Sequence, residues 1–223
     1  MQRLLTLARY EARITFSLTL VLVPVALLLV ALTHGVLEPA ALWRRHFIED
    51  CESFIPIALA LITTPLLLVD SEAGMVELSA TLPRRTILQV RWLTLWAACW
   101  ALLLAGLEAM NLIWGPVLFW RGILAALGPS LFLTALAVWS ATLSGRLAVG
   151  YLATIAFPVA DLILRILGAY TVVPPLQLLD TFAYRWTMAS PPWYAVKLFM
   201  LVVGLAGLQG CILLANRLYR RTL

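Results

Sequence analysis

The sequence predicts an all-α protein with six membrane-spanning helices, and three observations lead to this class. Hydrophobic residues make up 63% of the chain and charged residues only 12%, against about 25% charged residues in ordinary soluble domains. The apolar residues gather into stretches near the length of about 20 residues that a helix needs to cross a membrane. The basic residues lie at the ends of these stretches and form no basic face, so nucleic acid is excluded as a partner. We expect a single transmembrane domain, residues 1–223, in contact with the lipid bilayer.

Six apolar stretches follow one another with short connections between them. The second is short and contains Pro56 and Pro65, which leave backbone carbonyls that neighbouring helices must help to satisfy. The sixth contains Gly204, Gly207 and Gly210, a spacing that predicts close packing against another helix. The six expected spans are residues 16–33, 53–69, 92–114, 122–143, 147–167 and 195–215.

The distribution of basic residues predicts the orientation. Positively charged loops are retained in the cytoplasm, and most of the arginines face the cytoplasm if the N-terminus lies inside. We therefore expect both termini in the cytoplasm and the protein in a bacterial inner or plasma membrane. Trp120 and Trp193 fall near the expected outer boundaries, where tryptophan commonly anchors a helix at the interface. Lys197 is the only lysine, and composition alone gives it no role.

The N-terminal residues 2–14 have the pattern of an amphipathic helix. Arg9 and Arg13 fall on one side of a helical wheel, and Leu4 and Leu7 fall on the other. Such a helix lies along the cytoplasmic surface of the membrane. Glu11 falls within its apolar side, which favours contact with a protein partner. The alternative is a basic flank that only fixes the topology.

The loop between the second and third expected spans has a second amphipathic pattern. Met75, Leu78 and Leu82 recur at i, i+3 and i+7, beside the acidic residues Glu72 and Glu77. This spacing predicts a short cytoplasmic helix with one apolar face. The segment is too polar to span a membrane and too apolar for a solvated loop, so its apolar face should be covered by a peripheral subunit or by lipid headgroups.

This loop resembles the first cytoplasmic loop of the permease subunits of type-2 ABC exporters. That loop carries an acidic residue, a glycine, Glu-Leu, and then Leu-Pro followed by basic residues. The family's basic residue about three positions after the proline is replaced here by Thr86, and the arginines come earlier. The matching positions are Glu72, Gly74, Glu77, Leu78, Leu82 and Pro83, followed by Arg84 and Arg85.

The resemblance implies that residues 72–82 form a coupling helix, which docks into a separate ATP-binding subunit. Glu72 and Glu77 would make polar contacts with that ATPase, while Met75, Leu78 and Leu82 seat the helix. The chain has no Gly-x-x-x-x-Gly-Lys-Ser/Thr motif, so ATP would be bound and hydrolysed by the partner, and the chain itself is neither an enzyme nor a cofactor protein.

The resemblance also implies the architecture of the complex. Six spans are half of the usual exporter complement, so we expect a homodimer or a pair with a related permease. Residues 168–194 would return into the membrane as short helices that close the outer end of the pathway. A surface loop with aromatic anchors is the alternative for this segment.

Charged residues within membrane spans are expensive and are functional candidates by default. Asp161 and Arg165 are spaced i, i+4 in the fifth expected span, so they can pair on one helix face, and we favour a structural ion pair over a substrate site. Glu108 in the third span has no sequence-local partner and is the better candidate for lining a pathway.

Two other classes of function are weighed against the permease. A membrane-embedded enzyme would need a nucleophile, a metal cluster or paired carboxylates, and neither His-Glu-x-x-His nor Gly-x-Ser-x-Gly is present. An ion-coupled secondary transporter would use Glu108 or Asp161 as its ion site. Such a carrier has no evident use for the amphipathic loop helix, so the exporter permease is the function that we expect.

Overall fold

The computed structural model describes residues 22–26, 28, 40–67, 84–114, 119–184 and 190–222. Within these ranges the chain forms helices and turns without any strand, which confirms the all-α prediction for this part of the chain. Three predicted features lie outside the described residues: the surface helix at 2–14, most of the span at 16–33, and the coupling helix. The coupling positions concerned are Glu72, Gly74, Met75, Glu77, Leu78, Leu82 and Pro83.

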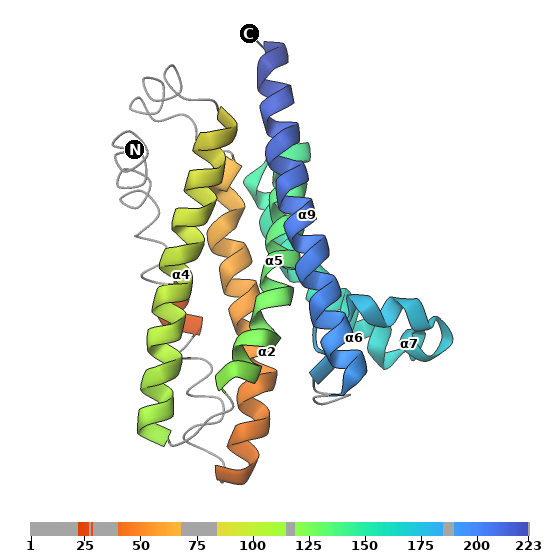
Figure 1. Cartoon of the computed structure of the whole chain (residues 1–223). Coiled ribbons are helices and arrows are strands. Elements are labelled where there is room, and N and C mark those ends of the chain that lie inside the picture. Colours follow the sequence, from red (N-terminus) through yellow and green to blue (C-terminus); the bar gives the residue numbers. More distant parts are fainter. Residues whose placement is uncertain are drawn as a thin grey trace.

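Five longer helices run alternately up and down along the molecule (Figure 1). The start of α4, the turn between α5 and α6 and the C-terminal end of α9 lie at one end of the bundle, which we call the Arg84 end after the first residue of α4. The starts of α5 and α9 lie at the opposite end, which we call the Phe119 end after the first residue of α5. The elements are α2 (Ala40–Thr63), η1 (Thr64–Leu67), α4 (Arg84–Trp114), α5 (Phe119–Ser144), α6 (Leu147–Ile166), α7 (Ala169–Val172), η2 (Pro174–Leu179) and α9 (Pro191–Thr222).

Four helices in the described ranges are long and apolar enough to cross a membrane, which is compatible with a multi-pass membrane protein. They contain the expected spans at 92–114, 122–143 and 195–215 and all but the last residue of the one at 147–167. Helices α4, α5 and α9 extend beyond the expected spans because backbone hydrogen bonding does not depend on hydropathy. The apolar segments are Arg85–Leu112, Phe119–Ser144, Leu147–Ile166 and Pro191–Leu214.

Helix α2 differs most from its prediction, because it begins at Ala40 rather than near Ser53. Glu49, Asp50 and Glu52 lie near its middle, where their charges lower the local hydropathy but the helix continues. All three side chains are buried. Residues that the sequence placed in a loop therefore belong to the interior of the helix bundle.

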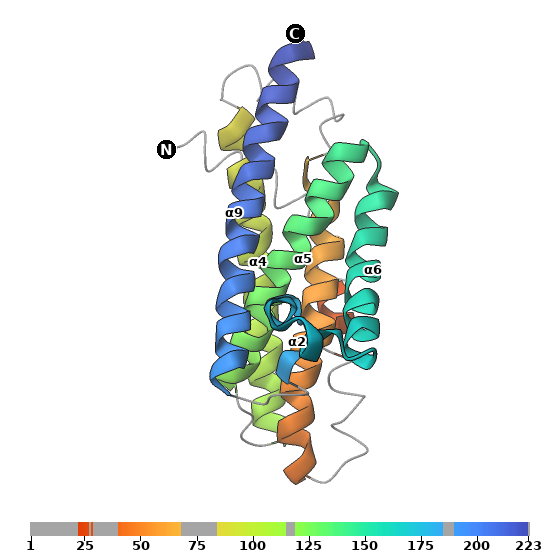
Figure 2. The same ribbon diagram turned by 90° about the vertical axis from the view of Figure 1, so that its right-hand side faces the viewer.

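The core is organised around α5, which packs mainly against α9 and α2 and then against α6. Figure 2 shows α9 and α6 on either side of α5. A Cβ atom on Gly204 of α9 would lie 2.5 Å from the backbone carbon of Leu131, and one on Gly128 of α5 would lie 2.5 Å from the backbone oxygen of Lys197. The predicted role of Gly204 in close helix packing is confirmed, since no larger side chain fits at this separation.

The outward surface of the bundle is apolar. Only 22% of the membrane-compatible stretch of α6 is buried, against 67% for α5. The side chains of Leu152, Ile155, Val159 and Ile166 on α6 are exposed. A patch of this kind is unstable in water and fits contact with lipid or with another protein.

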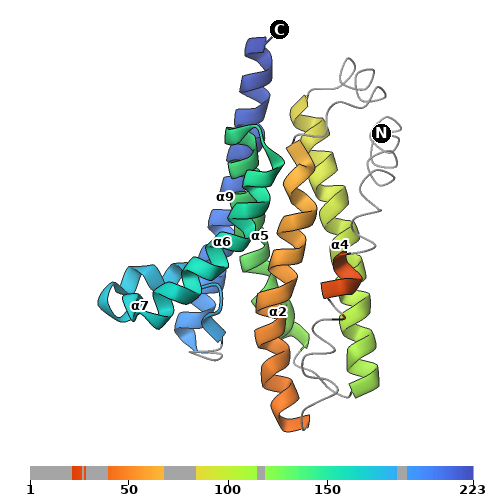
Figure 3. The ribbon, with the colours of Figure 1, turned by 180° about the vertical axis from the view of Figure 1, so that it is seen from behind.

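Helix α4 lies at the edge of the molecule, on the side away from α7 (Figure 3). A hydrogen bond of 3.4 Å from Gln89 Nε2 to Gln209 Oε1 connects it to α9. The rings of Trp92 and Trp96 are buried and lie 5.8 Å apart. Although Trp92 falls near the expected inner boundary, it is thus packed inside the protein and does not serve as an interfacial anchor.

Candidate functional site

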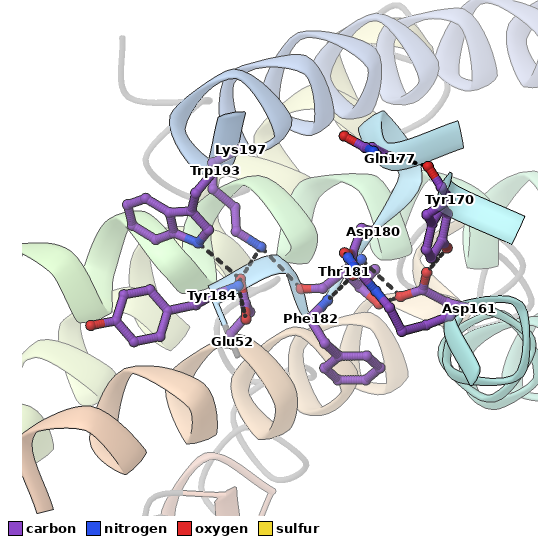
Figure 4. A network of polar contacts seen from close by, with 11 residues as sticks. Glu52, Asp161, Tyr170, Gln177, Asp180, Thr181, Phe182, Tyr184, Trp193 and Lys197 are labelled. Atoms are coloured by element: carbon purple, nitrogen blue, oxygen red, sulfur yellow. Dashed lines mark hydrogen bonds and ion pairs between the residues drawn. The ribbon is translucent and has the colours of Figure 1, made fainter. Parts of the chain in front are cut away.

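A cluster of charged and polar residues lies near the Phe119 end of the bundle, and its members are buried except for the half-buried Arg165. Figure 4 shows the cluster from close by. The cluster joins α2, α6 and α9 to residues 167–184, which belong to the connection between α6 and α9 and which we call the α7–η2 segment. It consists of Glu52 from α2, Asp161 and Arg165 from α6, Tyr170, Asp180 and Thr181 from the α7–η2 segment, and Trp193 and Lys197 from α9.

Glu52 and Lys197 form an ion pair in the centre of this cluster, and each side chain is only 1% exposed. The carboxylate of Glu52 accepts further hydrogen bonds from the indole N–H of Trp193 at 3.1 Å and from the backbone N–H of Tyr184 at 3.0 Å. The ammonium group of Lys197 also donates to the backbone carbonyl of Thr181 at 3.0 Å. Both charges are therefore compensated by an opposite charge and by groups of the α7–η2 segment, as buried charges require.

The sequence of α2 explains how Glu52 reaches this position. Phe47, Ile48, Ile55 and Leu59 are buried in the same helix, so the helical spacing of the apolar face continues through the acidic stretch. Glu52 lies three residues before Ile55 and therefore shares its inward face. The packing of the apolar residues holds the carboxylate inside the bundle.

Asp161 of α6 binds the α7–η2 segment at two points. Its Oδ2 atom accepts hydrogen bonds from the backbone N–H of Thr181 at 2.8 Å and from the Thr181 hydroxyl, while Oδ1 accepts one from the Tyr170 hydroxyl. Burial, together with the hydrogen bond to the negative Asp161, raises the pKa of Tyr170 well above its ordinary value. Tyr170 therefore keeps its proton and acts as a donor to the carboxylate.

Arg165, one turn after Asp161, makes an ion pair with Asp180. Its guanidinium group also lies 4.8 Å from the centre of the Tyr170 ring, in the position of a cation–π contact. Asp180 in turn accepts a hydrogen bond of 3.1 Å from the backbone N–H of Phe182. A cavity of about 70 Å³ adjoins these groups and is lined by Arg165, Gln177, Asp180, Ala183, Pro192, Trp193 and Val196.

The arrangement connects three long helices to one short segment. Thr181 has a central position, because its carbonyl binds Lys197 of α9 while its N–H and hydroxyl bind Asp161 of α6. No group of His, Cys, Asp and Glu side chains in the described ranges is arranged to hold a metal ion. The chemistry that the cluster can perform is electrostatic: it fixes the α7–η2 segment against α2, α6 and α9.

The structure brings two of the predicted site residues, Asp161 and Arg165, into this cluster. The prediction paired the two residues with each other, whereas in the structure each has a partner from the α7–η2 segment: Thr181 for Asp161 and Asp180 for Arg165. Glu108 is exposed on α4 and does not belong to the cluster.

The two basic residues that follow the coupling motif were expected in a loop, but in the structure they belong to a helix. Arg84 and Arg85 are the first residues of α4, and the Arg85 side chain is exposed. The predicted coupling segment therefore leads directly into a long helix. Any force on residues 72–82 would be applied to the end of α4.

Sequence analysis missed the other six members of the cluster: Glu52, Tyr170, Asp180, Thr181, Trp193 and Lys197. Trp193 was expected to anchor the protein at the interface, but its side chain is fully buried and binds Glu52. A signal for Glu52 was present in the helical spacing that continues through residues 47–59. Lys197 had a weaker signal, as a single charged residue inside an apolar stretch.

Comparisons with protein-family models, with curated proteins and with solved structures found no match for this chain. The class is therefore defined by the described residues themselves: an all-α protein with four helices of membrane-spanning length and a buried charge cluster that joins three of its long helices. The function must be argued from these features and from the sequence.

Proposed function

We propose that the chain is the membrane-spanning permease subunit of a type-2 ABC exporter, driven by ATP hydrolysis in a separate cytoplasmic ATP-binding subunit. Residues 72–82 would be the coupling helix, and the Arg84 end would face the cytoplasm. Two permease copies, or this chain and a related permease, would line a shared pathway. The expected span at residues 16–33 would complete the six-span topology, with both termini inside.

The observation that carries this proposal is the α7–η2 segment. Two short helices interrupt the connection between the last two long helices, and buried charges from three long helices bind this connection. A plain surface loop gains nothing from such an expensive set of buried charges. In a transporter, such buried charges would hold the segment at one end of the pathway and allow its release during the transport cycle.

The position of the predicted coupling segment supports the same function. Residues 68–83 connect η1 to α4, and both ends of this connection lie at the Arg84 end of the bundle (Figure 1). The α7–η2 segment lies toward the opposite end. Closure of an ATPase beneath the Arg84 end would pull on α2 and α4, and α2 carries Glu52 of the buried cluster.

The ion-coupled carrier is less well supported by the site. Both carboxylate oxygens of Asp161 already accept hydrogen bonds from Tyr170 and Thr181, so a cation would have to displace these donors. Glu108 is exposed on α4, outside the cluster.

An affinity pull-down from mild-detergent extracts tests the proposal directly. The tagged chain should recover an ATP-binding-cassette subunit in a fixed ratio, identified by mass spectrometry. Replacing Glu77 or Leu78 with arginine should abolish this recovery and leave membrane insertion intact. Arg146→Glu is the matched control, because Arg146 is exposed in the α5–α6 turn at the same end of the bundle. A pure preparation without any ATPase would refute the proposal.

A further inference from the structure

We propose that Glu52 and Lys197 are positioning residues that hold the α7–η2 segment closed over its end of the bundle, and that this segment opens when the two side chains lose their backbone partners. The inference rests on the proposed function, since a transport cycle is what would require the segment to move. It goes further by naming the two groups that control its position.

The argument begins with the targets of the two charges. Each binds the other, and each also binds the backbone of the α7–η2 segment: Glu52 accepts the N–H of Tyr184, and Lys197 donates to the carbonyl of Thr181. The ion pair thus joins α2 to α9 and, in the same place, joins both helices to the segment. Neither charge can leave the segment without losing part of its compensation.

The second step concerns the cost of this arrangement. A buried ion pair is often no more stable than two apolar side chains of similar volume, so stability alone does not account for Glu52 and Lys197. Their charges are satisfied while the segment is closed, and water can satisfy them once the segment opens. An apolar pair would lack this second option, because opening would expose it to water.

The third step concerns cooperativity. Asp161 of α6 holds the same residue, Thr181, through its N–H and hydroxyl, while Lys197 holds its carbonyl from α9. A movement of α9 relative to α6 therefore pulls the Thr181 peptide in two directions. The segment should be released as one unit rather than residue by residue.

Cysteine labelling in broken membranes can measure the closed state, because both membrane faces are then accessible to a water-soluble maleimide. The background carries alanine in place of the buried Cys51, Cys99 and Cys211. The reporter is Ala183→Cys, since Ala183 is 2% exposed and lines the small cavity of the cluster, where a sulfur atom has room. Val172→Cys, 79% exposed on α7, shows the labelling rate of a freely accessible site in the same segment.

The expected result is slow labelling of Ala183→Cys in the otherwise unchanged chain. Lys197→Met and Glu52→Gln should each raise its rate about tenfold or more. Lys197→Met removes the donor to the Thr181 carbonyl, and Glu52→Gln leaves only a neutral acceptor for the Tyr184 N–H. Labelling of Val172→Cys should not change. The double exchange Glu52→Lys with Lys197→Glu should not restore slow labelling, since a lysine at position 52 cannot accept the Tyr184 N–H.

Thr63→Val is the matched control. It removes a buried hydrogen bond of 3.2 Å between Thr63 of α2 and Thr134 of α5 that does not involve the segment. Unchanged Ala183→Cys labelling in the Lys197→Met and Glu52→Gln variants would overturn the inference. An equal increase in Thr63→Val would also overturn it, because general loosening of the bundle would then be the cause.

The labelling experiment and the pull-down fail independently. If an ATPase is recovered but Lys197→Met labels slowly, the permease proposal stands and the positioning role is refuted. If labelling behaves as expected but no ATPase is recovered, the two residues hold the segment in a protein of another function. Restoration of slow labelling by the charge exchange would show that the ion pair between α2 and α9 is sufficient, which contradicts the role assigned to the backbone contacts.

Discussion

Gly128 of α5 lies directly against the main chain of Lys197 in α9: a Cβ atom at Gly128 would be 2.5 Å from the Lys197 carbonyl oxygen and 3.2 Å from its carbonyl carbon. The close approach of two helix backbones therefore coincides with the residue that carries the buried positive charge. The packing of α5 against α9 sets the depth at which the Lys197 side chain enters the cluster.

Gly128→Ala should consequently destabilise the protein, by about 1–3 kcal/mol as is usual for overpacking of a filled core. Backbone cannot move aside as a flexible side chain can. Gly210→Ala is the matched control, because its added Cβ would meet only the Trp139 ring, at 3.3 Å. Thermal unfolding in detergent micelles gives the unfolding midpoint of each variant. If the midpoint of Gly128→Ala is no lower than that of Gly210→Ala, the packing argument is wrong.

Tyr170→Phe should lower the unfolding free energy by about 1.5–3 kcal/mol, because it removes a donor from the buried carboxylate of Asp161. Tyr194→Phe is the control, since the Tyr194 side chain is 42% exposed. If the two variants unfold at the same temperature, the Tyr170 hydroxyl contributes nothing to the stability of the cluster.

The raised pKa of Tyr170 also predicts that the stability of the protein depends on pH. Its pKa is raised in the folded protein, mainly by burial and then by Asp161, whereas in the unfolded chain the hydroxyl loses its proton near pH 10. Above about pH 10 the unfolded state therefore binds fewer protons than the folded state, and stability falls as pH rises. The difference in unfolding midpoint between the unchanged protein and Tyr170→Phe should narrow between pH 9 and pH 11, and a constant difference would show that Tyr170 does not titrate in this way.

Glu108→Gln should leave folding intact, within about 0.5 kcal/mol, because Glu108 is exposed on α4 and lies outside the buried cluster. If Glu108 lines the pathway of the assembled transporter, the same change should alter transport-coupled ATP hydrolysis of the complex in lipid nanodiscs. Glu52→Gln gives the contrast, since loss of one partner of a buried pair typically costs about 3–5 kcal/mol. Unchanged ATP turnover in Glu108→Gln would assign Glu108 to the lipid-facing surface.

The position of α4 can be tested by cross-linking. Gln89 and Gln209 approach to 3.4 Å between their side-chain atoms, so a chain with Cys only at positions 89 and 209 should be joined by a short bifunctional thiol reagent. The linked product has a changed mobility in denaturing gels after cleavage of the chain between the two positions. The two single-cysteine chains are the controls, and failure to form the product would place α4 elsewhere relative to α9.

The sequence predicts the long helices well, because hydropathy is a property of each stretch taken alone. The expected spans at 122–143 and 147–167 leave residues 144–146 between them, and the structure has the turn between α5 and α6 at this place. The ends of the helices are less predictable. Helix α2 begins thirteen residues before Ser53. Apolar residues on one face hold this part of the helix in the bundle, although acidic residues lower its mean hydropathy.

The buried cluster could be predicted only in part, because its members come from four separate parts of the chain. Asp161 and Arg165 were recognisable as charges inside a span, but their partners Thr181 and Asp180 lie in a segment whose path depends on tertiary packing. The Glu52–Lys197 pair joins the second and last expected helices. A local sequence pattern cannot predict such a contact, because the contact depends on how α2 and α9 pack against α5.

The ion pair between α2 and α9 has a consequence for the synthesis of the protein. The ribosome makes α2 long before α9, so the carboxylate of Glu52 exists before the ammonium group of Lys197 that neutralises it. An unpaired carboxylate is costly in lipid, so α2 on its own would favour contact with water over contact with lipid. The arrival of α9 supplies the opposite charge, so the burial of Glu52 depends on the synthesis of a helix that lies far along the chain.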